Sequence, residues 1–437
     1  MHPKNISISG YTYPLPDERI AAFPLPERDA SKLLIYKKGN ITEDIYKNIA
    51  PHIPANSLFV FNNTKVIQAR IPFQKPTGGT IEIFCLEPYG AINGYSTVMN
   101  KKGSVKWKCM IGGAGKWKEG ALEKQISNNN LQITITAKLI EQLSGAYVVE
   151  LSWQPADVSF AEVIKLFGNM PLPPYIKRKA EELDKERYQT IYAEKDGSVA
   201  SPTAGLHFTE NIFTALAEKN ISKAYLTLHV GAGTFKPVKA ALMQGHEMHA
   251  EWMDVTADSI QQLLDKIDDT VIAVGTTSLR TIESLYWMGV KAILFPESKM
   301  EDIAIHQWDV YEAPLLQTNF SVNEAFNALL QWMKKNELQR IICTTQILIC
   351  PGYKYKVVKA IITNFHQPQS TLLLLVAAAV GDDWKKIYCY ALENDFRFLS
   401  YGDGSLLFIP GSYSLKFRPS NSMSGLDDYG SGRPDIM

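Results

Sequence analysis

The chain of 437 residues has little of the cysteine chemistry that stabilises small secreted folds or binds zinc. Its five cysteines are an odd number, they are spread widely, and no two of them form a CxxC pair. This pattern argues against a disulfide framework and against a zinc site built from cysteines. We therefore expect reduced thiols and a cytoplasmic protein.

Net charge and long apolar runs are also missing. The 45 basic residues balance the 45 acidic ones, so no overall field attracts nucleic acid or an anionic membrane, and a nucleic-acid partner has to use a local patch. The longest apolar run, Leu372 to Val380, is far shorter than the roughly 20 residues of a membrane span. The first residues lack the features of a signal peptide. These absences predict a soluble protein.

Several nucleotide-binding motifs are absent as well. The stretch GAGTFK is not a GxGxxG followed by a ribose-binding acid, and the chain has no Walker A, GxSxG or kinase motif. Nucleotide hydrolysis and dinucleotide redox chemistry of the usual kinds are therefore poor candidates.

The order of apolar patterns predicts an α/β main domain with an inserted small all-β, barrel-like domain. Between Ala69 and Trp153, short alternating strands are separated by glycines, as in a small barrel. From Phe160 onward strands alternate with helices, as in α/β folds. We expect a discontinuous catalytic domain over residues 1–66 and 154–410, a barrel over residues 67–153 and a disordered tail over residues 411–437.

Three histidines lie where predicted strands or loops end. His229 closes the strand AYLTLHV, His207 lies in the loop SPTAGLHFT before a helix that Thr209 caps, and His366 follows a strand in ITNFHQPQST. Ligands of open α/β sheets bind at the carboxyl ends of strands, so a shared site is one interpretation. The alternative is that each histidine only fixes its own loop.

A second polar group begins the predicted helix in VIAVGTTSLRTIESL. Backbone N–H groups and the hydroxyls of Thr276, Thr277 and Ser278 converge there, which favours binding of a carboxylate or phosphate. Further along the same helix, Arg280 and Glu283 either contact a ligand or form an i,i+3 surface pair.

Two weaker patterns remain open. In HEMHAE, His246, His249 and Glu251 are candidate metal ligands on one helical face, but HExxH is absent, so we expect no metal. Near the end, Arg397, Tyr401 and Asp403 surround glycines in a predicted hairpin.

In their joint order, these segments resemble the S-adenosylmethionine:tRNA ribosyltransferase-isomerase family of queuosine biosynthesis. The resemblance covers most of residues 11–408 and rests on stretches such as YPLPDERIAAFPLPERDASKLL, LFVFNNTKVIQAR, LPPYIKR, GSVASPTAGLHFT, HEMHAEW, AVGTTSLRTIES and ITNFHQPQSTLLLLV. The chain departs from the family at Asn63 and Lys359, where members generally have Asp, at Gln68, where they have Pro, and in a longer segment between Pro296 and Arg340.

The resemblance implies an enzyme that uses S-adenosylmethionine as a ribosyl donor. The ribosyl part is transferred to the aminomethyl group of a 7-deazaguanine base in tRNA and rearranged to epoxyqueuosine, with release of adenine and methionine. Because the sulfonium acidifies the C5′ protons, the reaction needs a base, for which His207, His229 and His366 are candidates. Glu251 and Glu283 are candidates for the methionine ammonium, and Arg280 with the Thr276–Ser278 turn for the carboxylate.

Further substrate contacts are expected at Thr203, Asn364, Arg397, Tyr401 and Asp403. The tRNA phosphates are expected to meet local basic groups, of which the first three residues named below lie near the barrel junction. These residues are Lys65, Arg70, Lys75, Lys177 and Arg178. We expect a monomer. The alternatives are a divergent relative with another acceptor, a hydrolase with a metal on His246, His249 and Glu251, and a non-enzymatic RNA-binding module.

Overall fold

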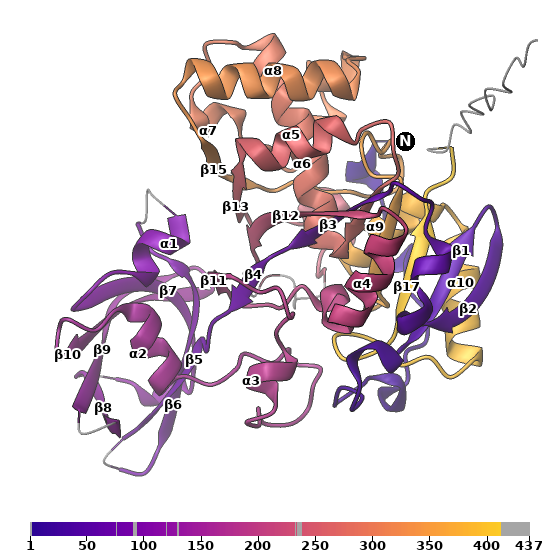
Figure 1. Ribbon diagram of the computed structural model, residues 1–437. Coiled ribbons are helices and arrows are strands. Elements are labelled where there is room, and N and C mark those ends of the chain that lie inside the picture. Colours follow the sequence, from indigo (N-terminus) through magenta and orange to yellow (C-terminus); the bar gives the residue numbers. More distant parts are fainter. Residues whose placement is uncertain are drawn as a thin grey trace, which may run out of the picture.

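The computed structural model describes residues 2–75, 77–90, 94–118, 120–128, 131–231, 233 and 238–411. All of the predicted tail except Gly411 lies outside this range, as does most of the stretch GAGTFKPV. Figure 1 shows two parts, a larger one built on a long sheet with helices around it and a smaller one made almost entirely of strands. The predicted fold class is confirmed.

The larger part contains a mixed sheet of nine strands in the order β15-β13-β12-β3-β14-β16-β17-β1-β2. Its centre is parallel, with β3 paired to β12 and β14, and β14 to β16. The strands are β1 (Lys32–Lys37), β2 (Asn40–Ile45), β3 (Leu58–Asn62), β12 (Ser222–His229), β13 (Glu251–Thr256), β14 (Val271–Val274), β15 (Arg340–Thr345), β16 (Ala360–Asn364) and β17 (Gly404–Phe408).

Apolar residues explain the central strands, since every residue of β3, β14 and β16 is buried. Among the helices of this part, α6 is almost completely buried. The helices are α3 (Asp184–Arg187), α4 (Glu210–Glu218), α5 (Ala257–Asp265), α6 (Gly275–Leu294), α7 (Met300–Ile303), α8 (Val322–Lys335), α9 (Thr371–Val380) and α10 (Asp383–Glu393). In the described residues no helix is long and apolar enough to cross a membrane.

Side-chain caps begin several helices where the sequence predicts them. Thr209 accepts a hydrogen bond from the backbone N–H of Ile212, and Ser370 caps α9 in the same way. Ser321 and Glu324 form a capping box at the start of α8. The cap predicted at Thr209 is confirmed.

The smaller part is an antiparallel sheet of six strands in the order β5-β6-β7-β10-β9-β8, and its two end strands contact each other. The strands are β5 (Arg70–Gln74), β6 (Thr80–Pro88), β7 (Ser104–Gly112), β8 (Leu122–Asn128), β9 (Leu131–Leu143) and β10 (Ala146–Gln154), with helices α1 (Gly94–Met99) and α2 (Phe160–Phe167). A short parallel pair, β4 (Thr64–Val66) and β11 (Lys195–Ser198), lies at the junction. We keep the residue limits of the domains as a proposal.

The predicted hairpin around Tyr401 is wrong. Residues before β17 form a loop, and β17 pairs with β16 and with β1, which are distant in the sequence. The side chain of Asp403 accepts hydrogen bonds from the backbone N–H groups of Lys32 and Arg397, which holds this loop against the start of β1. Tertiary hydrogen bonds therefore replace the local turn that Asp-Gly suggested.

Candidate functional site

Polar residues converge at one edge of the nine-stranded sheet. The parallel strands β3, β12, β14 and β16 end there, at Asn62, His229, Val274 and Asn364. Because β13 is antiparallel to β12, its first residue, Glu251, lies at the same edge. Strands from distant parts of the sequence thus deliver their polar ends to one place.

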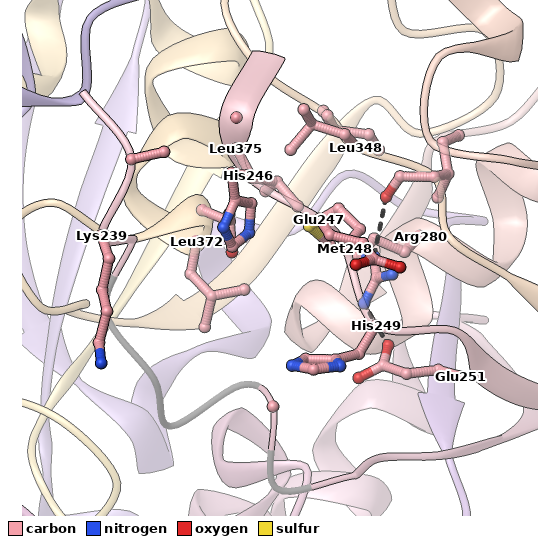
Figure 2. Close-up of a pocket in the computed structure, with 16 residues that line it drawn as sticks. Lys239, His246, Glu247, Met248, His249, Glu251, Arg280, Leu348, Leu372 and Leu375 are labelled. Atoms are coloured by element: carbon pink, nitrogen blue, oxygen red, sulfur yellow. Dashed lines mark hydrogen bonds and ion pairs between the residues drawn. The ribbon is translucent and has the colours of Figure 1, made fainter. Parts of the chain in front are cut away.

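The first cavity at this edge has a volume of ≈ 290 Å³ and is lined in part by His246, His249, Glu251, Arg280 and Leu372. Figure 2 shows Glu251 and His249 beside Arg280, with Lys239 on the other side of the cavity. Glu251 comes from β13 and Arg280 from α6. A buried helix and a strand end therefore hold the charged wall of the cavity.

An ion pair joins Arg280 and Glu251 in this wall, and both side chains are only 5% exposed. Arg280 also donates from Nε to the backbone carbonyl of Ile347 at 3.2 Å. Its Nη2 is buried and has no hydrogen-bond partner in the described part of the chain. A buried guanidinium with free N–H groups beside a cavity is suited to binding a carboxylate.

The second cavity has a volume of ≈ 90 Å³ and shares Leu372 with the first. The first residues of α6, from Gly275 to Thr277, line it together with Ser201 and His366. The buried hydroxyls of Thr277 and Ser201 have no partner among the described residues. Since buried polar groups are normally hydrogen-bonded, these two unsatisfied hydroxyls are candidates for contacts with a ligand.

Thr203 and Asn364 belong to the wall of the second cavity. The hydroxyl of Thr203 donates to the side-chain oxygen of Asn364 at 2.8 Å, and the Asn364 amide lies 3.4 Å from Nε2 of His207. This chain of contacts joins the helical turn η8 (Thr203–His207) to the end of β16. The structure thus brings Thr203, Asn364 and Thr276 to one cavity.

Desolvation by burial lowers the pKa of all three candidate histidines, to about 3 for His207 and His366 and to about 4 for His229. Of the three, His366 lines the second cavity. His207 lies behind Asn364 and stacks on Tyr46 with ring centroids 4.1 Å apart. The three histidines are therefore neutral at pH 7, so none of them acts there as an imidazolium acid, and each has one ring nitrogen that can accept a proton.

His229 lies at the junction with the barrel. Its Nδ1 is 3.2 Å from the hydroxyl of Thr64, and its ring stacks on Tyr95 of α1 at 4.7 Å between centroids. It lines neither cavity. A Cβ on Gly197 would lie 2.8 Å from Nδ1 of His229, so only glycine fits beside the ring.

Some predicted ligand contacts have other partners in the structure. Both carboxylate oxygens of Glu283 are occupied, by the hydroxyl of Tyr353 and by the backbone N–H groups of residues 356–358. Ser278 donates its hydroxyl to the backbone carbonyl of Val274. Glu283 is buried, so it forms no surface pair with Arg280. We therefore leave Glu283 and Ser278 out of the proposed site.

The group near the C-terminus also has structural partners. Arg397 forms an ion pair with Asp403 at 3.2 Å. Tyr401 donates to the buried carboxylate of Asp184. None of Arg397, Tyr401 and Asp403 lines either cavity. These residues hold loops behind the site.

The interpretation of HEMHAE as a helical metal site is wrong about the local structure. Residues 246–250 form no helix, and Glu251 begins a strand. Glu251 pairs with Arg280, and the part of the chain that the structure describes contains no group of three His, Cys, Asp or Glu side chains placed to hold a metal ion.

Each basic residue predicted to meet tRNA has a partner in the structure. Arg70 pairs with Glu82, Lys177 with Asp17 and Arg178 with Asp184. The remaining two interact with Asp196 (Lys65, at 4.0 Å) and with a backbone carbonyl (Lys75, at 2.7 Å). The structure does not gather these five into one free cationic surface.

The sequence interpretation did not include Ser201, Lys239, Gln307 and Leu372. Ser201 lies within the GSVASP loop, just before Pro202, so its place in a turn was a usable signal. Gln307 lies in the segment between Pro296 and Arg340, and its side chain bonds the backbone of His246 and of Met248. No sequence pattern indicates contacts between residues so far apart in the chain.

Comparisons with known proteins identify the family of this chain. Residues 8–407 match the model of a family described as queuosine biosynthesis protein. An S-adenosylmethionine:tRNA ribosyltransferase-isomerase from Magnetococcus marinus is 34% identical over 404 residues, 92% of this chain and 94% of that protein. One from Halothermothrix orenii is 35% identical over 408 residues, 92% of this chain and 100% of that protein.

A crystal structure of S-adenosylmethionine tRNA ribosyltransferase from Thermotoga maritima is also similar, at 25% identity and a TM-score of 0.43, covering 91% of this chain and 99% of that one. The fold and the family match together define an α/β enzyme with an inserted barrel. The chain belongs to the queuosine biosynthesis protein family. The predicted family membership and the prediction of an enzyme are confirmed.

Proposed function

We propose that this protein transfers the ribosyl part of S-adenosylmethionine to the aminomethyl group of a 7-deazaguanine base in tRNA and isomerises it to epoxyqueuosine. Adenine and methionine are the other products. S-adenosylmethionine is a co-substrate, and the reaction needs no metal. The family match and the names of the two relatives support the reaction class. A monomer in the cytoplasm stays our prediction.

The observation that carries the proposal is Nη2 of Arg280 beside the first cavity, which has no hydrogen-bond partner among the residues that the structure describes. An α-carboxylate would accept hydrogen bonds from this nitrogen. Glu251 neutralises part of the charge of Arg280 and has lone pairs left for the α-ammonium group. The zwitterionic methionine end therefore has complementary partners of both signs in one wall.

The nucleoside end would lie in the second cavity, which the first cavity meets at Leu372. There the unpartnered hydroxyls of Thr277 and Ser201 are available to ribose or adenine. The start of the 20-residue helix α6 adds backbone N–H groups and the positive end of its dipole. This end of the helix would stabilise negative charge that develops as adenine leaves.

The base for the C5′ proton is proposed to be a neutral histidine. Of the three candidates, His366 lines the second cavity, so it is the one closest to the proposed nucleoside position. Its Nε2 is 2.9 Å from the hydroxyl of Thr363. A lowered pKa makes a histidine a weak base, so the carbon acid must be activated by the adjacent sulfonium.

Asn63 bears on the choice of acceptor. Its side-chain amide donates to Glu194 at 3.3 Å, and its carbonyl accepts from the hydroxyl of Thr227 at 2.7 Å. An aspartate here would place a second carboxylate against Glu194. The departure from the family pattern at Asn63 thus has a local structural reason.

The proposal is tested by incubating the protein with S-adenosylmethionine and tRNA that carries the aminomethyl-deazaguanine base. We expect adenine, methionine and the modified nucleoside to form together, as measured by mass spectrometry. tRNA without that base is the control and should give no adenine. If the modified tRNA remains unchanged while the protein is folded, the proposed reaction is wrong.

A further inference from the structure

A groove of ≈ 200 Å³ lies on the barrel, away from both cavities of the candidate site. It is formed by Tyr89 just after β6, by α1 and the turn after it, and by β7 and β10. Figure 1 shows α1 and β7 together at one side of the barrel. The lining residues are Tyr89, Val98, Lys101, Ser104, Val105, Lys106 and Glu150. We call it the Tyr89 groove.

The Tyr89 groove carries cations whose charge is not neutralised by a close carboxylate. Lys101 and Lys106 are exposed, and neither forms an ion pair with any residue that the structure describes. Glu150 lies opposite Lys106 on the neighbouring strand without such a pair. The five basic residues that the sequence indicated for tRNA binding all have partners. The unpaired lysines of this groove are therefore not among the residues that the sequence indicated.

An exposed aromatic ring completes the groove. Tyr89 is 43% exposed although it is a large side chain next to a folded barrel. Its backbone N–H donates to the carbonyl of Lys106 at 2.9 Å, which holds the backbone of Tyr89 beside that lysine. Its hydroxyl donates to Glu141 at 3.3 Å. A held aromatic ring beside flexible cations is the combination that binds unpaired nucleotides by stacking and phosphate contact.

One short helix connects the groove to the junction between the barrel and the main sheet. Val98 of α1 lines the Tyr89 groove, and Tyr95, less than one turn earlier, stacks on His229. His229 ends β12 at the sheet edge where the candidate site is formed. RNA that lies in the groove would therefore be separated from this edge by the thickness of a single helix.

We propose that the Tyr89 groove binds an unpaired segment of the tRNA substrate, with a base stacked on Tyr89 and phosphates at Lys101 and Lys106. The inference rests on the proposed function, because it takes tRNA as the substrate. The groove would hold the RNA beside the site while the modified base enters it. A purely structural role of the lysines, as solvated charges facing Glu150, is the competing explanation.

The first experiment measures the affinity of the full-length protein for tRNA as a function of salt. In the double variant Lys101→Glu, Lys106→Glu, we expect the Kd to rise at least about tenfold, and the slope of log K against log salt to become shallower by roughly 1.4 for two lost phosphate contacts. A matched variant, Lys47→Glu with Lys334→Glu, changes the same charge at exposed lysines of the main domain and should match the unaltered protein.

The second experiment separates stacking from charge. Tyr89→Ala should raise the Kd for tRNA by roughly 5- to 150-fold, whereas Tyr89→Phe, which keeps the ring and loses only the bond to Glu141, should remain close to the unaltered protein. The affinity of each variant for S-adenosylmethionine is measured by calorimetry without tRNA and should be unchanged. Unchanged affinity shows that the variant is folded.

The outcomes are distinguishable from failure of the proposed reaction. If the groove variants bind tRNA as well as the matched variant does, the groove proposal is wrong, whether or not the unaltered protein makes epoxyqueuosine. If they lose affinity while the unaltered protein forms no product, the groove stands and the reaction proposal fails. If the unaltered protein does not bind tRNA, the groove proposal is also overturned.

Discussion

Arg280 and Glu251 form a buried ion pair in the wall of the first cavity, and Nη2 of Arg280 is left without a partner among the described residues. Burying a charged pair costs desolvation free energy that is recovered only when the remaining N–H groups also find acceptors. The pair is therefore incomplete as a structural element. A bound carboxylate would complete it, which links this detail of packing to substrate binding.

Thr277 offers a test of the second cavity. Since its hydroxyl has no hydrogen-bond partner in the described part of the chain, Thr277→Val should change the free energy of unfolding by less than about 0.5 kcal/mol. If the hydroxyl binds the nucleoside, the Kd for S-adenosylmethionine should rise roughly three- to tenfold. Calorimetry and urea denaturation measure the two quantities on the same sample.

Thr281 on the same helix is the matched control, because its hydroxyl donates to the backbone carbonyl of Thr277 at 2.9 Å. Thr281→Val should lower the free energy of unfolding by roughly 1 kcal/mol and leave the Kd unchanged. Equal Kd values for both variants and the unaltered protein would show that the hydroxyl of Thr277 does not contact the ligand.

The buried histidines predict a pH dependence of stability. Their pKa values are lower in the folded state, about 3 to 4, than the ordinary value of 6.5, so the unfolded chain binds more protons between these limits. Stability should therefore be complete above pH 6.5 and fall as the pH is lowered toward 4, by up to about 1.4 kcal/mol per pH unit for each histidine.

Urea denaturation between pH 4.5 and 8 measures how steeply the free energy of unfolding changes with pH. In His229→Gln, the free energy of unfolding should depend less steeply on pH below pH 6.5, because one of the three buried histidines no longer contributes. This change in slope is expected whatever the variant does to the stability at neutral pH. The curve above pH 7 is the internal reference and should be unaffected by this group. A slope identical to that of the unaltered protein would mean that His229 is protonated in the folded state.

Gln307 is expected to position the loop that lines the first cavity. Its amide donates to the backbone carbonyl of His246 at 2.8 Å, and its oxygen accepts from the backbone N–H of Met248 at 2.9 Å. Gln307→Leu removes both bonds, so the Kd for S-adenosylmethionine should rise about tenfold through loss of loop order.

The matched control is Gln317→Leu, an exposed glutamine in the same segment between Pro296 and Arg340. It should have the affinity of the unaltered protein. If Gln307→Leu binds S-adenosylmethionine with unchanged affinity, the loop needs no support from this segment, and the positioning role is disproved.

Glu283 should act only in folding. Its two oxygens accept four hydrogen bonds, so the amide nitrogen in Glu283→Gln would face donors. We expect the free energy of unfolding to fall by roughly 2 kcal/mol or more, with an unchanged Kd for S-adenosylmethionine below the melting temperature. A loss of affinity in the folded variant would return Glu283 to the site.

The sequence predicted much of this fold because periodicity and capping are local. Alternating apolar residues identify the barrel strands, and Ser321 and Thr209 begin helices where their side chains predict them. The part that failed depended on distant partners. Asp-Gly near Tyr401 suggested a hairpin, but the loop is held by bonds to β1, which no local pattern encodes.

The same distinction applies to the candidate site. Arg280 and Thr277 could be selected because they follow a strand at the start of a helix, and the structure places both at cavities. Glu283 lies three residues after Arg280, but the sequence does not show which side of a buried helix faces the cavity. The free cations of the Tyr89 groove were missed for a similar reason, since ion pairing depends on side-chain geometry.

The most direct test of the central claim is a double cycle between Arg280 and the carboxylate of the co-substrate. The Kd values of S-adenosylmethionine and its decarboxylated analogue are measured by calorimetry on the unaltered protein and on Arg280→Met. We predict that removing the carboxylate weakens binding by roughly ten- to a hundredfold in the unaltered protein and only slightly in the variant. An equal loss in both proteins would contradict the account.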